Sequence, residues 1–246
     1  MDSAKDHYSY RVYADPETAQ SFDQLRFGSA IGEFIKQTQE MLVFSQLPDV
    51  AGWKVIDIGA GTGRLTIPFL EKGAQVTACD ASEEMLKVLQ AKIKHSGLQT
   101  KVVDAHDLPF PDHNFDCAIS FRVLLHVIDW KKALAEFCRV SKNWVIIDLP
   151  PRRGFLRFAP LFHLLKKPFT KKLQAYKVLP LREVEEQLRQ QHFEIVSRDD
   201  GFFLPIFAHR IVRSTRFTRV SEKLFRHLGL TRLFGSPATI FARRIR

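Results

Sequence analysis

Short apolar runs alternate with longer amphipathic stretches along most of this chain of 246 residues. The apolar runs have the length of buried strands, and the amphipathic stretches repeat at the spacing of a helix face. This alternation predicts an α/β domain in which helices cover a mainly parallel sheet. The predicted strands span residues 54–58, 75–79, 100–103, 117–120, 144–149, 193–197 and 238–242.

Helices are predicted between these strands and ahead of the first one. Near the N-terminus, Asp15 is a suitable N-cap and Pro16 a suitable first helical residue. Ser82 can also cap a helix, because acidic residues follow it in the first turn, where the helix dipole favours them. The other predicted helices span residues 30–47, 64–72, 131–140 and 181–191, and one basic amphipathic helix carries the arginines from Arg210 to Arg226.

The composition is that of a soluble globular protein, with 45% hydrophobic residues. No stretch approaches the roughly 20 apolar residues of a membrane span, and the polar residues 1–7 do not resemble a signal peptide. Cys79, Cys117 and Cys138 have spacings that fit neither a zinc site nor a disulfide framework. We therefore expect free, buried thiols in a cytoplasmic protein, and no metal requirement.

The net charge of +10 is unevenly distributed. Residues 1–148 contain 16 Lys or Arg and 20 Asp or Glu, whereas residues 149–182 contain nine basic residues and no acidic one. Residues 201–246 contain ten basic residues and one acidic residue. Such asymmetry carries information about charged partners and not about the fold.

A glycine-rich turn, GAGTG at residues 59–63, follows the first predicted strand. Glycine accommodates positive φ and lets a ligand approach the backbone, and the helix that follows offers unpaired N–H groups. A dinucleotide fold would have its third glycine where Arg64 stands, so a pyrophosphate site is disfavoured. The alternative is that the turn is only a structural corner between a strand and a helix.

The second predicted strand is followed by Asp80. A carboxylate at this position suits a ribose diol, because it accepts from both hydroxyl groups. The predicted ligand is therefore a nucleoside that carries something other than a diphosphate.

The runs VIDIGAGTG, VTACD and VVDAHDLPFPDHNFD together resemble the class I S-adenosylmethionine-dependent methyltransferases. They are most similar to the branch that includes the ubiquinone and menaquinone C-methyltransferases, and the resemblance covers roughly residues 50 to 150. It implies a single domain with a doubly wound, Rossmann-like, seven-stranded sheet whose last strand is antiparallel. The implied parts are an N-terminal helical cap (1–50), a cofactor-binding core (51–149), a substrate lid after the fifth strand (150–182) and a C-terminal part of the sheet (183–246).

The resemblance also implies S-adenosylmethionine as cofactor, with S-adenosylhomocysteine as product. The cofactor-binding residues that it implies are Asp57, Gly59, Ala60, Gly61, Asp80, Ala81, Met85, Asp104, Ala105, Phe121 and Arg122. Asp104 would accept from the adenine amino group and the Ala105 N–H would face a ring nitrogen. Met85 either lies against the adenine or is a plain core residue. Arg122 faces either the cofactor carboxylate or an anionic acceptor, and His106 neighbours this site without an assigned role.

His126 lies in the segment 121–130, which follows the fourth predicted strand. Ligands of open α/β sheets bind beyond the carboxyl ends of the strands, so the methyl acceptor is expected there. His126 matches one histidine of the branch's L-H-H-V motif, and Leu125 replaces the other. It is the candidate general base, because its unperturbed pKa is near operating pH, although a structural role is equally open. The family's Pro-Gly-Gly turn before the fifth strand is replaced by the predicted turn Ser-Lys-Asn at 141–143.

Residues 150–182 interleave Phe and Leu with Lys and Arg. An apolar, basic lid suits an apolar acceptor with a negative group, or an anionic membrane surface. The alternative is a lid helix packed on the sheet with solvated lysines. The predicted function is methyl transfer to a small apolar, aromatic or lipid-like acceptor. An RNA methyltransferase, supported by charge alone, and a non-catalytic S-adenosylmethionine-binding protein are the competing hypotheses.

Overall fold

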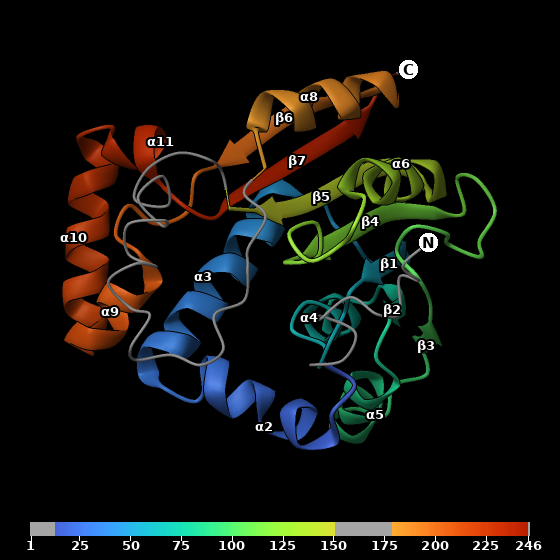
Figure 1. The fold of residues 1–246 in the computed structure, drawn as a ribbon, viewed down its shortest axis with the longest axis horizontal. Helices are drawn as coiled ribbons and strands as arrows, with labels where there is room; N and C mark the ends of the chain where they lie inside the picture. The colour runs from blue at the N-terminus through green and yellow to red at the C-terminus, as the bar shows by residue number, and fades with distance from the viewer. Residues whose placement is uncertain (1–12, 151–178, 246) are drawn as a thin grey trace.

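A seven-stranded sheet in the order β3-β2-β1-β4-β5-β7-β6 forms the centre of the protein (Figure 1). The computed structural model describes residues 13–150 and 179–245. Neighbouring strands are parallel from β3 to β5, and β7 runs antiparallel to both β5 and β6. This confirms the predicted doubly wound sheet with an antiparallel last strand. The strands are β1 (Lys54–Ile58), β2 (Gln75–Asp80), β3 (Leu98–Val102), β4 (Phe115–Phe121), β5 (Ser141–Leu149), β6 (Phe193–Asp199) and β7 (Ala238–Arg244).

Helices flank the sheet, and two of the predicted caps are present. The Asp15 carboxylate accepts from the Thr18 amide at 2.9 Å, and the Ser82 hydroxyl accepts from the Met85 amide at 3.2 Å. Each satisfies an amide that has no partner within its own helix. The helices are α2 (Pro16–Phe27), α3 (Ala30–Gln46), α4 (Thr66–Glu71), α5 (Glu83–Lys92), α6 (Trp130–Val140), α8 (Leu181–Gln190), α9 (Ile206–Val212), α10 (Thr215–His227) and α11 (Leu230–Phe234).

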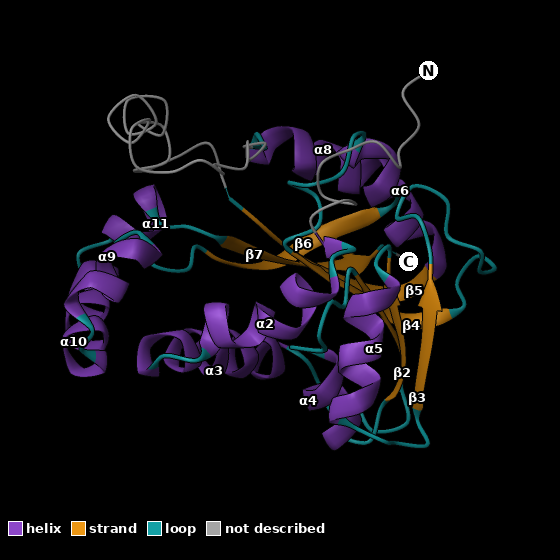
Figure 2. Cartoon of the chain, turned by 60° about the horizontal axis from the view of Figure 1, so that its bottom comes forward, coloured by secondary structure: helices purple, strands orange, loops and turns teal. Residues whose placement is uncertain are grey.

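Helices cover both faces of the sheet (Figure 2), and its central strands β1, β4, β5 and β7 are buried over most of their length. Phe137 of α6 and Leu188 of α8 pack on one face together with Ile56 of β1. Val43 of α3 and Phe69 of α4 pack on the other face. Strands buried on both faces are apolar almost without interruption, which is why their positions could be recognised in the sequence. The cores on both faces position the carboxyl ends of β1 to β4 along one edge.

The start of β5 differs from the prediction. Residues 141–143 were expected to form a turn, but α6 ends at Val140 and β5 begins at Ser141. The strand accommodates the extra residues as an irregularity, because Phe115 pairs with Ser141 whereas Cys117 pairs with Trp144. The buried Ser141 hydroxyl donates to the Trp144 carbonyl at 2.6 Å, which stabilises this local distortion.

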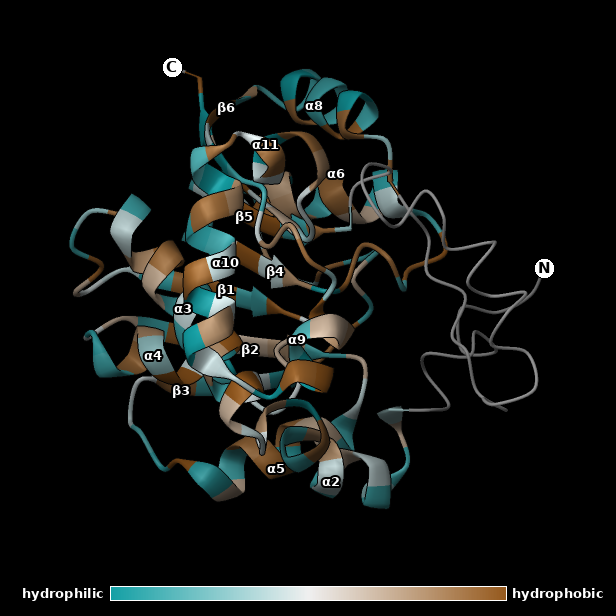
Figure 3. Ribbon diagram, turned by 90° about the vertical axis from the view of Figure 1, so that its left-hand side faces the viewer, coloured by the Kyte–Doolittle hydropathy of each residue, from teal (hydrophilic) through white to brown (hydrophobic). Residues whose placement is uncertain are grey.

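The predicted basic helix is two helices. Arg213 has φ 54°, in the left-handed region, and its amide donates to the His209 carbonyl at the end of α9. Ser214 then begins a new helix, because its hydroxyl accepts from the Phe217 amide at 3.2 Å. The prediction of one continuous helix was therefore wrong. The helices α9, α10 and α11 lie together at one end of the sheet, which faces the viewer in Figure 3.

The three cysteines are free and buried, as expected. Burial raises the pKa of the Cys79 and Cys138 thiols to about 12, so both stay protonated at neutral pH. Within the described ranges, no group of His, Cys, Asp and Glu is arranged to hold a metal ion, and no helix is long and apolar enough to cross a membrane. Most of the predicted lid, residues 151–178, lies outside the described residues.

Candidate functional site

The glycine turn connects β1 to α4 and takes three left-handed conformations. Gly59, Gly61 and Gly63 have φ of 73°, 54° and 90°. A Cβ on Gly59 would lie 2.1 Å from a methyl group of Val123, and one on Gly63 would lie 2.3 Å from Leu89. A Cβ on Gly61 would meet no atom within 4 Å. Packing therefore requires glycine at the two ends of the turn, whereas Gly61 borders open space into which a ligand can fit.

Asp80, at the end of β2, binds the glycine turn. Its Oδ2 accepts from the Gly61 amide at 2.8 Å, and its Oδ1 accepts from the Ser82 amide at 2.8 Å. Each carboxylate oxygen has a second lone pair, so both oxygens can still accept from a ribose hydroxyl. Burial raises the pKa of Asp80, and the amides of Ser82 and Gly61 partly oppose this shift.

Asp104 follows β3 and is bound by His106. The His106 amide and ring Nδ1 lie 2.9 and 2.6 Å from Oδ1 of Asp104. The Asp129 amide donates to Nε2 of the same ring at 3.2 Å. Because Nε2 accepts, we assign the proton of the neutral ring to Nδ1, which donates it to Asp104. His106, for which no role was predicted, thus orients the carboxylate predicted to bind adenine. Its only signal in the sequence is its position two residues after Asp104.

Asp57, near the end of β1, precedes the turn. Its Oδ2 accepts from the Thr66 hydroxyl at 2.6 Å, and the side chain is 3% exposed. Burial raises the pKa of Asp57 to about 6, although the Thr66 hydrogen bond and the charge of Arg64 lower it. Asp57 therefore joins β1 to the first residue of α4, the two elements that the turn connects.

Arg64 lies in the site, which the sequence did not indicate beyond its position after the glycines. Its guanidinium lies 5.2 Å from the ring centroid of Phe121 and 5.8 Å from that of Phe27. It also donates to the side-chain carbonyl of Gln39 in α3. Burial lowers the pKa of Arg64 to about 10, and the charge of Asp148 opposes this shift. The turn thus places a cation between the N-terminal helices and the end of β4.

Arg122 directly follows β4 and has a partner that the sequence did not reveal. Its amide donates to Oδ1 of the buried Asp148 in β5, and its Nε lies 2.8 Å from Oδ2. Arg122 has a left-handed backbone, with φ 65°. In this conformation its amide and its side chain both contact the carboxylate of Asp148. Asp148 therefore offsets part of the charge that Arg122 offers to an anionic group.

His126 lies in the loop between β4 and α6, half-buried. Its amide donates to the Val123 carbonyl at 2.7 Å, and its ring meets the Tyr13 ring edge to face at 6.0 Å. The Tyr13 carbonyl accepts from the Ser82 hydroxyl at 2.6 Å. The structure thus brings the candidate base next to the first described residue and near the end of β2.

The N-terminal helix α2 is attached to the glycine turn. Asp23 accepts from the Thr62 hydroxyl at 2.5 Å and also binds the Lys92 ammonium. Lys92 donates in turn to the Thr62 carbonyl at 2.8 Å. These contacts join α2, the turn and α5 in one network. Sequence reasoning missed Asp23, because its partners lie 39 and 69 residues away along the chain.

The remaining predicted residues occupy the same edge of the sheet. The amides of Gly59 and Ala60 donate to the Cys79 carbonyl at 2.7 and 2.9 Å, which ties the turn to β2. Ala81 is exposed and Ala105 half-buried. Met85 is 2% exposed, which favours its interpretation as a core residue.

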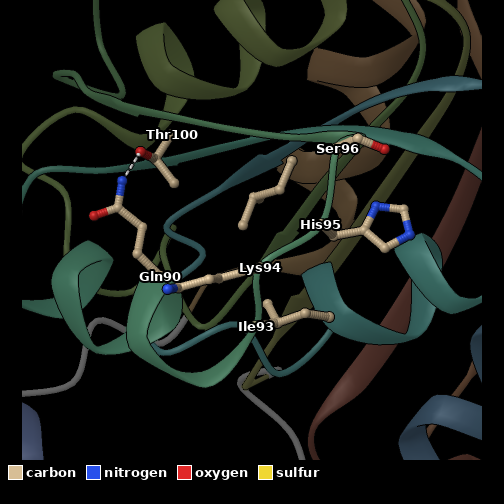
Figure 4. Close-up of a pocket in the computed structure, with 7 residues that line it drawn as sticks. Gln90, Ile93, Lys94, His95, Ser96 and Thr100 are labelled. Atoms are coloured by element: carbon tan, nitrogen blue, oxygen red, sulfur yellow. Dashed lines mark hydrogen bonds between the residues drawn. The ribbon is translucent and has the colours of Figure 1, made fainter.

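A surface pocket of about 580 Å³ lies elsewhere (Figure 4). It is lined by the end of α5 and the beginning of β3, where Gln90 donates to Thr100 at 2.7 Å. The amino end of β3 lies at the opposite edge of the sheet from Asp80 and Asp104. This pocket is therefore separate from the candidate site.

Part of this chain is similar in sequence to known methyltransferases. Residues 56–146 match the family described as methyltransferase domain. Over 91 residues the chain is 41% identical to the demethylmenaquinone methyltransferase of Paenarthrobacter aurescens, covering 37% of this chain and 35% of that protein. Over 134 residues it is 36% identical to a ubiquinone/menaquinone biosynthesis C-methyltransferase of Burkholderia multivorans, covering 52% of each. The matches thus span between about a third and a half of these relatives.

Solved structures extend the likeness of fold to nearly the whole chain. A SAM-dependent methyltransferase of Thermotoga maritima has a TM-score of 0.64 at 18% identity, covering 93% of this chain and 98% of that one. The magnesium protoporphyrin IX methyltransferase of Synechocystis PCC 6803, crystallised with bound SAH, has a TM-score of 0.64 at 19% identity, covering 96% and 99%. Residues 56–146 therefore match a methyltransferase domain, and the chain has the same fold as these methyltransferases of known structure.

Proposed function

We propose that this protein transfers the sulfonium methyl group of S-adenosylmethionine to a small acceptor. The observation that carries the proposal is the pair of carboxylates at or just beyond the carboxyl ends of the neighbouring strands β2 and β3, Asp80 and Asp104, of which Asp80 also binds the amide of Gly61. Both carboxylates are held by hydrogen bonds, and carboxylates accept hydrogen bonds without donating them. They complement the hydroxyls of a ribose and the amino group of an adenine. The same negative charge disfavours a pyrophosphate.

Each predicted residue has a proposed part in binding. Asp80 would accept from the ribose hydroxyls, Asp104 from the adenine amino group, and the Ala105 N–H would face the ring. The turn at 59–61 would admit the ligand next to the backbone, with Asp57 joining the two elements that the turn connects. Ala81, Phe121 and Arg122 are proposed to complete the wall of the same site, with Met85 packed in the core behind it.

Bound S-adenosylmethionine supplies an activated methyl group, so the protein's own contribution is chiefly alignment. Holding the two reactants in line can lower the activation barrier by several kcal/mol, out of the roughly 7–11 kcal/mol that ideal orientation offers. His126 is proposed to take a proton from the acceptor, which matters for an O–H or an acidic C–H and little for a neutral amine. Its position between Tyr13 and the end of β4 supports this assignment.

Calorimetric titration with S-adenosylmethionine and S-adenosylhomocysteine tests the cofactor assignment. Asp80→Ala should abolish micromolar binding, because it removes the acceptors for the ribose. Asp49→Ala is the matched control, since Asp49 also accepts an amide two residues ahead, at 3.0 Å, but lies before β1 and away from the site. Binding that survives in Asp80→Ala, or is absent from the wild type, would contradict the proposal.

The acceptor is proposed to be small and apolar, aromatic or lipid-like. The names of the relatives given above, which refer to quinones and a porphyrin, support this class. The basic charge of residues 201–246 also supports contact with an anionic membrane surface, and the free buried thiols support a cytoplasmic location.

Methyl transfer to a panel of quinols, phenols, amines and RNA, measured with labelled methyl groups, tests the acceptor class. Transfer to RNA alone would favour the RNA methyltransferase. Cofactor binding without transfer to any acceptor would favour the non-catalytic hypothesis.

A further inference from the structure

The helix α10 presents an apolar stripe to solvent. Phe217, Val220, Leu224 and Leu228 recur at helical spacing and are 44%, 62%, 52% and 59% exposed. The residue that α10 buries is Thr218. A helix on a globular domain normally buries its apolar face and exposes its polar one. Figure 3 shows that α10 lies on the outside of the molecule. The exposed fractions show that these four residues, here called the α10 stripe, face solvent.

A basic row accompanies the stripe along the same exposed side. Arg216, Arg219 and Lys223 follow at spacings of three and four residues and are all exposed. Across residues 206–234 there are seven Lys or Arg and a single acidic residue, Glu222. Arg216 and Lys223 make no ion pair with any residue that the structure describes. The outer surface of α10 therefore combines apolar side chains with uncompensated positive charge.

The single acid faces inward. Glu222 accepts from the amides of Phe203 and Leu204 at 2.7 and 2.9 Å and lies 2.9 Å from Nε2 of His209. The buried His209 ring bonds on its other side to Thr218 at 3.0 Å. These polar contacts fix the inner face of α10, so the outward direction of the stripe is set by tertiary structure.

We infer that α10 docks on a membrane surface that contains anionic lipids. The α10 stripe would enter the boundary between headgroups and acyl chains, and the basic row would bind the headgroups. A second copy of this chain fits the stripe less well, because it would bring the two basic rows together. RNA would use the basic row but gains nothing from exposed valine and leucine.

Docking in this way would bring the N-terminal helices close to the lipid. The Arg219 guanidinium lies 5.7 Å from the Phe34 ring of α3, and Arg210 of α9 donates to the Arg26 carbonyl of α2 at 2.9 Å. The inference deepens the membrane contact in the proposed function and does not depend on methyl transfer.

Co-sedimentation of the full chain with vesicles tests the inference. The vesicles contain phosphatidylcholine, with or without phosphatidylserine, and the salt concentration is varied. Val220→Asp should remove binding to the anionic vesicles, because it places a charge in the stripe. Val196→Asp is the matched control, since Val196 lies on β6 and is 46% exposed. The double variant Arg216→Gln, Lys223→Gln should bind about fivefold more weakly for each charge lost.

Wild-type binding that needs phosphatidylserine and weakens with salt, together with loss in Val220→Asp only, would support the inference. Equal binding by Val220→Asp and the wild type would overturn it. A change in oligomeric state of Val220→Asp by light scattering, or binding to RNA but not to vesicles, would overturn it as well. Calorimetry with S-adenosylmethionine on each variant separates the two proposals, because vesicle binding by a protein that binds no cofactor would refute the proposed function alone.

Discussion

The imidazole of His106 donates its Nδ1 proton to the carboxylate of Asp104, with 2.6 Å between the two heavy atoms. The same ring accepts a hydrogen bond from the amide of Asp129, the N-cap of α6. The carboxylate proposed to bind adenine is thus connected to a helix that begins more than twenty residues further along the chain. Both contacts of His106 are made to Oδ1 of Asp104, so they restrict the orientation of this carboxylate. His106 is therefore a positioning residue of the candidate site.

His106→Ala should weaken binding of S-adenosylhomocysteine about tenfold, because a hydrogen bond to a charged group contributes roughly 1.5–3 kcal/mol. The specific readout is the affinity for an analogue that carries hypoxanthine in place of adenine and therefore lacks the amino group. The preference for adenine should shrink in the variant. His95→Ala is the control, since the His95 ring accepts the Gly97 amide at 3.1 Å but lies at the separate pocket. An unchanged preference would rule out the positioning role.

Asp57 should make stability depend on pH. Its pKa is about 6 in the folded protein against an ordinary value of 3.8. Between these values the folded protein holds a proton that the unfolded chain has lost, so the free energy of unfolding falls as pH rises through this window. The contribution is at most about 3 kcal/mol.

Urea unfolding of the wild type and Asp57→Asn at pH values from about 4 to about 7 measures this contribution. The asparagine can still accept from Thr66, so the variant should lose the pH dependence and keep the fold. Because the pKa of Asp80 is raised as well, the difference between the two proteins is the quantity to follow. Parallel curves would show that Asp57 does not titrate in this range.

Substitutions in the glycine turn should separate folding from binding. Gly59→Ala should reduce stability by about 2–4 kcal/mol, because it combines left-handed strain with a contact of 2.1 Å to Val123. Adding Val123→Ala should recover part of this loss. Gly61→Ala should reduce stability by only about 1 kcal/mol, since its Cβ meets no atom, yet it should reduce cofactor affinity. Thermal unfolding and calorimetry on the same samples would show whether the two effects separate.

The contact between Asp23 and the glycine turn should control release of the cofactor. Asp23→Ala removes the partners of Thr62 and Lys92, so α2 should exchange its amide hydrogens faster and the cofactor should dissociate faster. Glu17→Ala is the control, because Glu17 is an exposed acid on the same helix. Equal dissociation rates in stopped-flow experiments would mean that α2 does not cover the cofactor.

Local signals explain which parts of the fold could be predicted. Apolar runs located the strands, and Asp15 and Ser82 marked helix starts, because each of these features depends on residues close in sequence. The break at Arg213 escaped prediction, since the basic spacing continues through it and only the cap at Ser214 marks it. The contacts of Asp23 and Arg64 escaped because they depend on which helices the fold brings together.

The hydrogen bonds of Asp80 to Gly61 and Ser82 have a further consequence. They order the glycine turn before any ligand arrives, so the conformational entropy of the turn is lost on folding and not on binding. A ribose would then meet a preorganised receptor. Its affinity would depend on the hydroxyl contacts themselves, and the association rate would be limited by the movement of α2 and not by rearrangement of the turn.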